Sequence, residues 1–445
     1  MKIGLIGVGR LGLPVAVCIE RHGHTVFAFD INPSIRPGVR PEDLLSTREA
    51  GPGNVGDLKD TARTCERLHF CASVADVCEQ AEIVFVAVQT PHEPLYEGTT
   101  RVPKSRSNFN YDFLCAAVSE VSAAASSFGR ELPTVVISTV LPGTIRERIL
   151  PLLHPNVKLC YNPFFIAMGT VWNDFTNPEF ILLGRHDEST GTLVKLFYNT
   201  ITSAVVFETT IENAELIKVS YNTFIGMKIA YANTIMEMCN KLPNTNVDAV
   251  TAAISLANKR LMSPAYLTGG MGDGGGCHPR DNIAMSWLSE KLGLSFNFFD
   301  SIMMAREKQT DFLADLICGE RSNSKEELRI VILGKAFKPD TNLVTGSPSV
   351  LLGNILKERF VPFTFADPYC LDCDSVATAT SCKAIFFIGC KHSCFVDIQF
   401  PVGSIVLDPH RFIPKDNSRD VKVRYIGTGE WYDHASEYVV SWGGE

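Results

Sequence analysis

The sequence has no long apolar run, no excess of basic residues and no internal repeat. A membrane-spanning helix takes about 18 consecutive apolar residues, and no stretch of the chain reaches that length. Lys and Arg number 41 against 49 Asp and Glu, which gives a net charge of −8. Because nucleic acids and anionic membranes bind basic surfaces, we expect no nucleic-acid partner and no membrane partner.

We also expect no secretion signal, because the apolar run IGLIGVG near the start is too short for a signal-peptide core. We therefore expect a cytoplasmic protein. Its 14 irregularly spaced cysteines then indicate reduced thiols rather than a disulfide framework. The CxxC pair Cys370 and Cys373 is followed by other cysteines but by no second CxxC or HxxxH pair, so we predict no metal site.

The start of the chain predicts a dinucleotide-binding βαβ unit. Gly7, Gly9 and Gly12 form GxGxxG between an apolar strand and the helical stretch LPVAVCIERHG. Asp30 ends the next strand, 18 residues after Gly12. Such glycines let a pyrophosphate approach a helix N-terminus. The acid accepts hydrogen bonds from a ribose and repels a 2′-phosphate, so NAD is the predicted cofactor.

Two further strands are predicted within AEIVFVAVQTP and PTVVISTVLPG, each leading through a loop into a helical pattern. Alternating strands and helices predict a parallel sheet, which binds ligands at the carboxyl ends of its strands. The loops at 90–91 and 138–139 are therefore predicted to face the cofactor. The predicted NAD contacts are Gly7, Gly9, Arg10, Leu11, Gly12, Asp30, Thr90, Pro91, Ser138 and Thr139.

The rest of the chain predicts two further regions. The stretch from about 213 to 242 is a long amphipathic pattern, which predicts a helix suited to connecting domains or forming a dimer. A polar break, GERSNSKEE, precedes four strand-like stretches: LRIVILGKAF, VPFTFADPY, KAIFFIGC and SIVLDPH. We expect an α/β protein with a Rossmann-like NAD-binding domain (1–200), a central helical domain with a long connecting helix (201–318) and a C-terminal Rossmann-like α/β domain (319–445).

The segment MGDGGGCHPRD places Cys277 where a helix is predicted to begin, since Pro279 suits a first turn. Free amide N–H groups and the helix dipole favour a thiolate there, with Asp281 near the same pocket. Lys218 and Asn222 lie four residues apart on one helix face, as a donor pair able to stabilise an oxyanion. The alternatives are apolar packing of Cys277 and solvent exposure of Lys218.

The order of these motifs resembles the UDP-glucose/GDP-mannose dehydrogenase family along nearly the whole chain. The matching stretches are GVGRLG, VQTP, STVLPGT, NPFFIAMGT, ELIKVSYNTF, GGGCHPRD, GKAFKPDTNLVTGSPS and ADPY. The resemblance implies a homodimer with NAD-binding, helical and nucleotide-binding parts. It also implies oxidation of the 6-hydroxyl of a nucleotide sugar to a carboxylate, with two molecules of NAD consumed.

By motif position the resemblance implies a role for each site residue. Cys277 is expected to capture the aldehyde as a thiohemiacetal, whose oxidation gives a thioester that water hydrolyses. Lys218 and Asn222 are expected to stabilise the oxyanion, Asp281 to lie near the water or the lysine, and Thr139 to position the water. The expected substrate contacts are Phe165, Ile166, Lys218, Asn222, Arg260 from the neighbouring subunit, Tyr266, Gly274 and Lys338.

The chain departs from the family at several positions. Phe164 stands where the family's NPEF motif has a glutamate implicated in water activation, and Met168 replaces another acid. Thr345 replaces a frequent arginine, and Asp273 is an added acid in the glycine loop. Two alternatives stay open: release of the aldehyde after one hydride transfer, or a catalytically silent nucleotide-sugar-binding protein.

Overall fold

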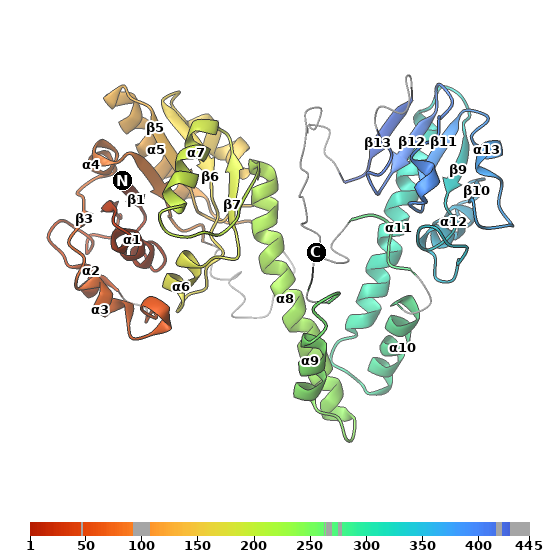
Figure 1. Cartoon of the computed structure of the whole chain (residues 1–445), viewed down its shortest axis with the longest axis horizontal. Coiled ribbons are helices and arrows are strands. Elements are labelled where there is room, and N and C mark those ends of the chain that lie inside the picture. The colour runs from red at the N-terminus through yellow and green to blue at the C-terminus, as the bar shows by residue number, and fades with distance from the viewer. Residues whose placement is uncertain are drawn as a thin grey trace. The chain divides into compact units, whose positions relative to one another are not determined.

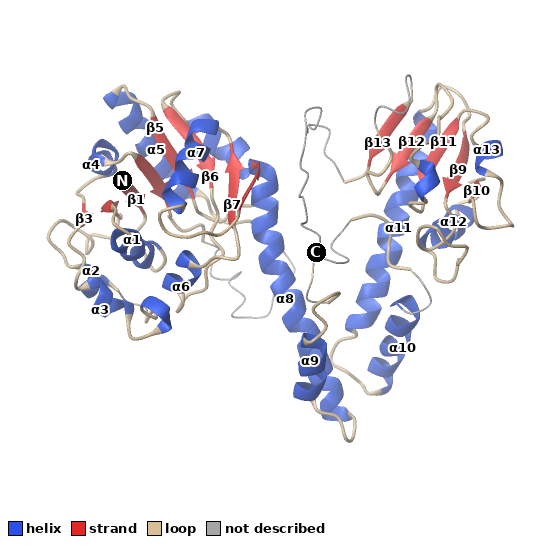
Figure 2. Cartoon of the chain, in the orientation of Figure 1, coloured by secondary structure: helices blue, strands red, loops and turns tan. Residues whose placement is uncertain are grey.

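The computed structural model describes residues 1–45, 48–91, 107–261, 263, 269–274, 278–414 and 421–427. The chain divides into two compact units, Met1–Met227 and Lys228–Glu445, whose elements are labelled in Figure 1. Each unit contains one sheet with helices, as Figure 2 shows, and further helices lie between the two sheets in sequence. The predicted α/β class, with a helical region between two strand-rich regions, is confirmed.

In the described part of the first unit, eight strands form one sheet in the order β3-β2-β1-β4-β5-β6-β7-β8. Neighbouring strands run parallel, except that β6 and β7 are antiparallel. The order 3-2-1-4-5-6 is that of a dinucleotide-binding fold. The strands are β1 (Lys2–Ile6), β2 (Thr25–Phe29), β3 (Leu68–Phe70), β4 (Ile83–Val86), β5 (Leu132–Val136), β6 (Val157–Tyr161), β7 (Ile181–Arg185) and β8 (Val206–Thr210).

Helices cover both faces of this sheet because successive strand residues point to opposite sides. Leu5 and Phe85 belong to an apolar layer shared with α1, α6 and α7, whereas Ile6 and Val84 belong to a layer shared with α4 and α5. The helical segments are α1 (Gly12–Arg21), α2 (Pro41–Leu44), η1 (Pro52–Asn54), α3 (Leu58–Ala62), α4 (Val74–Gln80), α5 (Asp112–Phe128), the π-helix η3 (Ile145–Ile149), η4 (Leu150–Leu152), α6 (Val171–Thr176) and α7 (Glu188–Tyr198).

The predicted long amphipathic helix is confirmed as α8 (Ile211–Lys241), which is 31 residues long and begins in the first unit. The second unit continues with α9 (Val247–Ser255), α10 (His278–Lys291) and α11 (Phe298–Asn323). The helix predicted to begin near Pro279 is confirmed as α10. None of the described helices is long and apolar enough to cross a membrane.

The second sheet has the order β10-β9-β11-β12-β13, with every neighbouring pair parallel. The four predicted strands are confirmed as β9 (Arg329–Leu333), β10 (Thr364–Ala366), β11 (Ala384–Ile388) and β12 (Ile405–Asp408). A fifth strand, β13 (Lys422–Tyr425), was not predicted. The helical segments beside this sheet are α12 (Pro348–Glu358), α13 (Val376–Ala379) and η5 (Ser393–Phe395).

The polar stretch GERSNSKEE begins inside α11 rather than after it, because the helix continues to Asn323. Leu313 and Ile317 anchor this part of α11 in the core of the second unit. The carboxylate of Glu320 contacts Lys422 Nζ at 3.0 Å and an Arg424 guanidinium nitrogen at 2.9 Å. These contacts keep a polar sequence helical. The domain boundaries at residues 200 and 318 stay predictions.

A buried carboxylate holds the loop that follows β9. Asp367 Oδ2 accepts hydrogen bonds from the N–H groups of Lys335 at 2.7 Å and Ala336 at 3.0 Å. The N–H groups of Tyr369 and Cys370 donate to its Oδ1 at 2.9 and 3.2 Å. Four backbone donors therefore depend on one side chain.

His392 completes this network. Its Nδ1 accepts a hydrogen bond from the N–H of Asp340, so the neutral ring carries its proton on Nε2 and donates it to Asp367 at 3.1 Å. Burial alone raises the pKa of Asp367, but the hydrogen bonds from His392 and the backbone outweigh burial and hold it well below its usual value. The folded unit therefore stabilises the ionised form of Asp367.

Asp367→Asn should destabilise the second unit by about 3 kcal/mol near neutral pH, because a single amide oxygen cannot replace two carboxylate oxygens. The contribution of Asp367 is present above the ordinary carboxyl pKa of 3.8 and is lost as pH falls toward the lower folded value. Stability of the variant should therefore depend less on pH below 5. Hydrogen exchange of peptides covering β9 and β10, measured across pH, tests this.

The exposed Asp397 supplies the control, because Asp397→Asn should leave this exchange unchanged. Equal exchange in Asp367→Asn and the unaltered protein would show that the network does not stabilise the unit.

Candidate active site

The glycine loop between β1 and α1 has the geometry that a dinucleotide needs. Gly7 has a φ of +90°, and its N–H donates to the carbonyl of Phe29 at 2.9 Å. A Cβ on Gly12 would lie 2.0 Å from the carbonyl oxygen of Gly7, so the loop and helix pack too closely for a side chain. A Cβ on Gly9 would meet no atom within 4 Å. The loop is therefore open at Gly9, where a pyrophosphate approaches in such folds.

Asp30 follows β2 and lies beside this loop. Its Oδ2 accepts a hydrogen bond from the N–H of Val8 at 2.9 Å, and its Oδ1 accepts one from Asn32 at 2.9 Å. Asp30 is only half-buried, so it fixes the loop and remains within reach of a ligand. Arg10 is exposed on the same loop and Leu11 is half-buried. The glycines and this carboxylate fit NAD.

The loops after β4 and β5 are joined by side-chain hydrogen bonds. Thr90 Oγ1 donates to the carbonyl of Thr139 at 2.7 Å, and Ser138 Oγ donates to the carbonyl of Val88 at 2.5 Å. Pro91 follows Thr90 in the first of these loops. Strand β4 lies between β1 and β5, and the three strands are parallel. The loops that follow them therefore lie at the same edge of the sheet as the glycine loop.

Lys218, Asn222 and Phe165 come together within the first unit. Lys218 is 7% exposed, and its Nζ contacts Asn222 Oδ1 at 3.5 Å. The ammonium lies 5.0 Å from the ring centroid of Phe165, which also packs on Phe180 and Tyr221. Burial lowers the pKa of Lys218. The alternative of a solvent-exposed lysine is therefore wrong.

Phe164 is half-buried and packs against the protein core. Its ring lies 5.6 Å from that of Phe175, and both Phe164 and Ile166 contact the apolar layer that α1 and α6 share. Asn162 anchors the start of the loop, where its Oδ1 accepts a hydrogen bond from the hydroxyl of Tyr198 at 2.5 Å. The buried part of the Phe164 ring contributes apolar contacts that a carboxylate would not make.

Gly274 and Lys338 lie near each other within the second unit. A Cβ on Gly274 would lie 3.2 Å from the Cβ of Phe337, the residue before Lys338. Lys338 is exposed, with its Nζ 5.5 Å from the ring centroid of Phe337. Asp273, the added acid of the glycine loop, pairs with Arg306 at 2.7 Å. The segment that leads to Cys277 is therefore fixed to α11.

The other predicted residues are placed in part or not at all. Cys277 and Tyr266 lie outside the described residues, as does the side chain of Asp281, although its backbone belongs to α10. Arg260 is exposed in the second unit. The assembly of these residues with Lys218 into one site stays a prediction.

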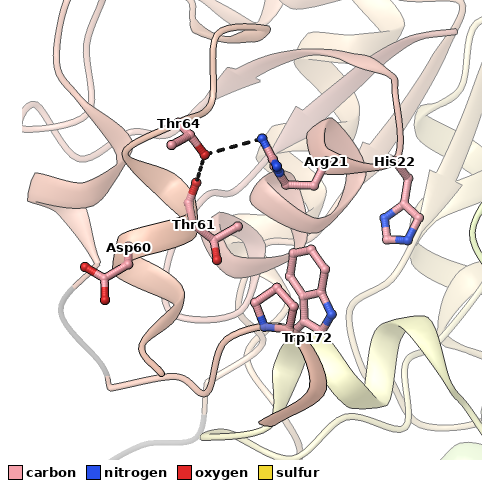
Figure 3. Close-up of a pocket in the computed structure, with 7 residues that line it drawn as sticks. Arg21, His22, Asp60, Thr61, Thr64 and Trp172 are labelled. Carbon is pink, nitrogen blue, oxygen red and sulfur yellow. Dashed lines mark hydrogen bonds between the residues drawn. The ribbon is translucent and has the colours of Figure 1, made fainter. Parts of the chain in front are cut away.

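A hollow of about 460 Å³ lies at the C-terminal end of α1 (Figure 3). Because the glycine loop adjoins the other end of α1, this hollow is separate from the predicted cofactor site. None of the predicted site residues lines it. Its lining residues are Arg21, His22, Pro52, Asp60, Thr61, Thr64 and Trp172.

The cysteines of the CxxC pair lie in the second unit. Burial raises the pKa of Cys370 to about 11 and that of Cys373 to about 12. Among the described residues, no group of three His, Cys, Asp or Glu side chains is placed to hold a metal ion.

Sequence reasoning missed two buried acids in the first unit. Glu215 accepts hydrogen bonds from the N–H groups of Gly143 and Ile145, which follow the predicted cofactor loop. Glu49 accepts hydrogen bonds from Gly169 at 2.8 Å and Val171 at 3.2 Å, in the loop after Phe164. The only sequence signal was an acid three residues before Lys218 in a mostly apolar helix.

Sequence models of two protein domains match the chain. The model described as "UDP-glucose/GDP-mannose dehydrogenase family, NAD binding domain" matches residues 1–202, and the model of the family's central domain matches residues 212–307. The two matches cover the glycine loop, the Thr139 loop, α8 and the segment containing Cys277.

Individual relatives are divergent but match over most of their length. UDP-glucose 6-dehydrogenase of Rickettsia conorii is 22% identical over 96% of this chain and 99% of its own. GDP-mannose 6-dehydrogenase of Pseudomonas aeruginosa is 25% identical over 80% of this chain and 78% of its own. A crystal structure of a ternary complex of GDP-mannose dehydrogenase from that organism has a TM-score of 0.82, with 22% identity, over 95% of this chain and 99% of that one. The likeness to it confirms the fold.

Asp30→Asn should lower the preference for NADH over NADPH by about tenfold, which corresponds to roughly 1.4 kcal/mol. The change removes the charge that would repel a 2′-phosphate and keeps one oxygen acceptor for the loop. Fluorescence titration of both nucleotides measures the ratio. The exposed Asp43→Asn is the control. An unchanged ratio would contradict the assigned role of Asp30.

Proposed function

The chain belongs to the UDP-glucose/GDP-mannose dehydrogenase family, and on that premise we propose that it oxidises the 6-hydroxyl of a nucleotide sugar to a carboxylate. The observation that carries the proposal is the buried Lys218, whose Nζ contacts the exposed Asn222, in a unit whose glycine loop fits NAD. Retaining such a pair would be hard to explain in a protein that only binds its ligand, because burying an ammonium is costly.

The proposed reaction consists of two oxidations and a hydrolysis. The alcohol loses a hydride and a proton to give an aldehyde, and the thiol of Cys277 adds to its carbonyl carbon to form a thiohemiacetal. Loss of a second hydride from carbon and of the hydroxyl proton gives a thioester, which water cleaves to release the carboxylic acid and restore the thiol. NAD supplies the hydride acceptor for both oxidations. Covalent attachment retains the aldehyde between them.

Lys218 is proposed to stabilise negative charge on the reacting oxygen. Its ammonium is buried against Phe165, and in the described part of the chain it forms no ion pair with a carboxylate. A desolvated, uncompensated cation interacts strongly with an alkoxide or a thiohemiacetal oxyanion. Asn222 would add an amide donor to the same oxygen. Thr139 is proposed to position the water, and Asp281 to lie beside that water or Lys218.

The presence of Phe164 in place of the family's glutamate favours a second candidate function, in which the substrate is oxidised only as far as the aldehyde. The aromatic ring takes the place of a carboxylate that could activate water, and it packs against Phe175 of the core. With no base at that position, the hydrolysis depends on Asp281. If Asp281 does not supply the base, a single hydride transfer ends the reaction.

The proposed substrate contacts are the residues that the family resemblance implies. Phe165, Ile166, Lys218 and Asn222 belong to the first unit. The proposed contacts in the second unit are Arg260 of a neighbouring copy, Tyr266, Gly274 and Lys338. A phosphate-bearing ligand suits the two cations among them, since Arg and Lys bind phosphate through charge-assisted hydrogen bonds.

A second copy of the chain is the proposed partner of α8. Phe224, Met227 and Tyr231 follow one another at helical spacing and are 43%, 47% and 37% exposed. Leu216 and Met236 are also half exposed, at 52% and 51%. A helix with this much uncovered apolar surface is typical of an interface between subunits.

Mixing the protein with NAD and a panel of nucleotide sugars should yield two NADH per substrate and an acid product by mass spectrometry. Cys277→Ser should abolish acid formation, because an alcohol side chain is a much weaker nucleophile than a thiolate. Cys382→Ser, at an exposed cysteine, should behave as the unaltered protein.

One NADH per substrate with an aldehyde product would support the second candidate function. Acid formation that survives Cys277→Ser would overturn the thioester route. Tight binding of a nucleotide sugar without NAD reduction at any pH would identify a catalytically silent binding protein.

Phe224→Glu should convert a dimer to a monomer, because a buried unpaired carboxylate at the interface costs several kcal/mol. Sedimentation equilibrium measures the mass. Leu196→Glu, at an exposed leucine of α7, should leave the dimer intact. A monomeric unaltered protein would contradict the proposed interface.

A further inference from the structure

Glu215 lies fully buried in the first turns of α8 and binds two backbone amides of another segment. Its Oε2 accepts a hydrogen bond from the N–H of Gly143 at 2.6 Å, and its Oε1 accepts one from the N–H of Ile145 at 2.8 Å. These amides belong to the start of the π-helix η3, where the chain leaves the loop after β5. Each carboxylate oxygen therefore satisfies one amide N–H at that helix start.

The segment that Glu215 binds is the continuation of the loop that carries Thr139. The carbonyl of Thr139 is held by Thr90, and the hydroxyl of Tyr111 contacts Leu141 N at 3.2 Å and Thr144 Oγ1 at 3.3 Å. Thr90 and Tyr111 attach this loop to the sheet and to the segment preceding α5. Glu215 attaches it to α8 through backbone amides in the protein interior, and Glu212 of α8 pairs with Arg146 of the same segment at the surface.

Glu215 and Lys218 lie three residues apart on α8, so they occupy neighbouring positions on one side of the helix. A shift of α8 relative to the loop would therefore move Lys218 and Asn222 relative to Thr139. Two short hydrogen bonds from backbone N–H groups to a buried carboxylate resist such a shift more strongly than contacts at the surface do.

We infer that Glu215 is a positioning residue: its carboxylate fixes the loop bearing Thr139 to the helix bearing Lys218 and Asn222. The catalytic consequence of this contact rests on the proposed function, whereas the contact between Glu215 and the loop amides is independent of it. Glu215 is placed to act through these residues, and no contact with a reacting atom is assigned to it. Its loss should therefore impair the chemical step more than ligand binding.

Glu215→Gln tests the inference with a side chain of the same shape. Its amide oxygen can accept one of the two hydrogen bonds, but its NH₂ group faces a backbone N–H where an acceptor is needed. Misplacement of catalytic groups by about 1 Å costs on the order of a hundredfold in rate. We expect kcat to fall at least about tenfold, with KM for the nucleotide sugar and the affinity for NADH changed less than about threefold.

Glu212→Gln is the matched control. Glu212 lies in the first turn of the same helix and pairs with Arg146 at 2.5 Å at the surface, without binding the loop amides. Its substitution should leave kcat within about twofold, because an exposed ion pair contributes little. Both variants are compared well below their melting temperatures, so that a simple loss of stability does not lower kcat.

Hydrogen exchange of a peptide covering residues 140–150 provides a readout independent of activity. Faster exchange in Glu215→Gln together with a lower kcat supports the inference. Unchanged exchange overturns the contact, and faster exchange with unchanged kcat overturns the positioning role. If the unaltered protein oxidises no nucleotide sugar, the proposed function and the catalytic consequence of Glu215 are both wrong. The hydrogen-exchange rate of residues 140–150 then still tests whether Glu215 holds this loop.

Discussion

Hydrogen bonds from backbone N–H groups to buried or half-buried carboxylates are the interaction on which the ends of both sheets depend. Loops at the carboxyl ends of parallel strands leave amides without sheet partners, and an unpaired buried amide is costly. Asp30 and Glu215 serve such amides in the first unit. Asp367, which follows β10, has the same role in the second unit, and Asp408, the last residue of β12, accepts hydrogen bonds from three backbone N–H groups. In the first unit, the loops proposed to bind NAD and to carry Thr139 are therefore held in place by Asp30 and Glu215. Neither acid is proposed to act on the reacting atoms.

The turns after β1 and β9 have the same backbone geometry but different surroundings. Gly7 and Gly334 have φ angles of +90° and +92°, and each is followed by a residue whose N–H donates to an acid at the end of the next strand. Asp30 accepts two amides and remains half-buried, so it can also bind a ribose. Asp367 accepts four amides and a hydrogen bond from His392, and it is 4% exposed. In the second turn, the oxygens of the buried Asp367 are therefore used by groups of the protein itself. In the first turn, Asp30 is half-buried and remains within reach of a dinucleotide.

The features that could be predicted from the sequence are those whose residues lie close together along the chain. The glycine loop, Asp30 and the pair Lys218–Asn222 follow fixed local spacings, so their geometry could be predicted. The partners of Glu215 lie 70 and 72 residues away, and only the packed structure joins them. The substitution at Phe164 was visible, but its packing on Phe175 was not. The strand β13 was missed because its short polar alternation, KVRY, resembles a surface loop.

We expect NAD to bind at the turn after β1 and to leave the corresponding turn after β9 unchanged. Hydrogen exchange with and without NAD, followed by mass spectrometry, distinguishes the two turns. Peptides covering residues 7–14 and 136–145 should be protected by NAD, and peptides covering residues 334–341 should show no change. Equal protection of the second turn, or no protection of the first, would show that the two turns do not differ in this way.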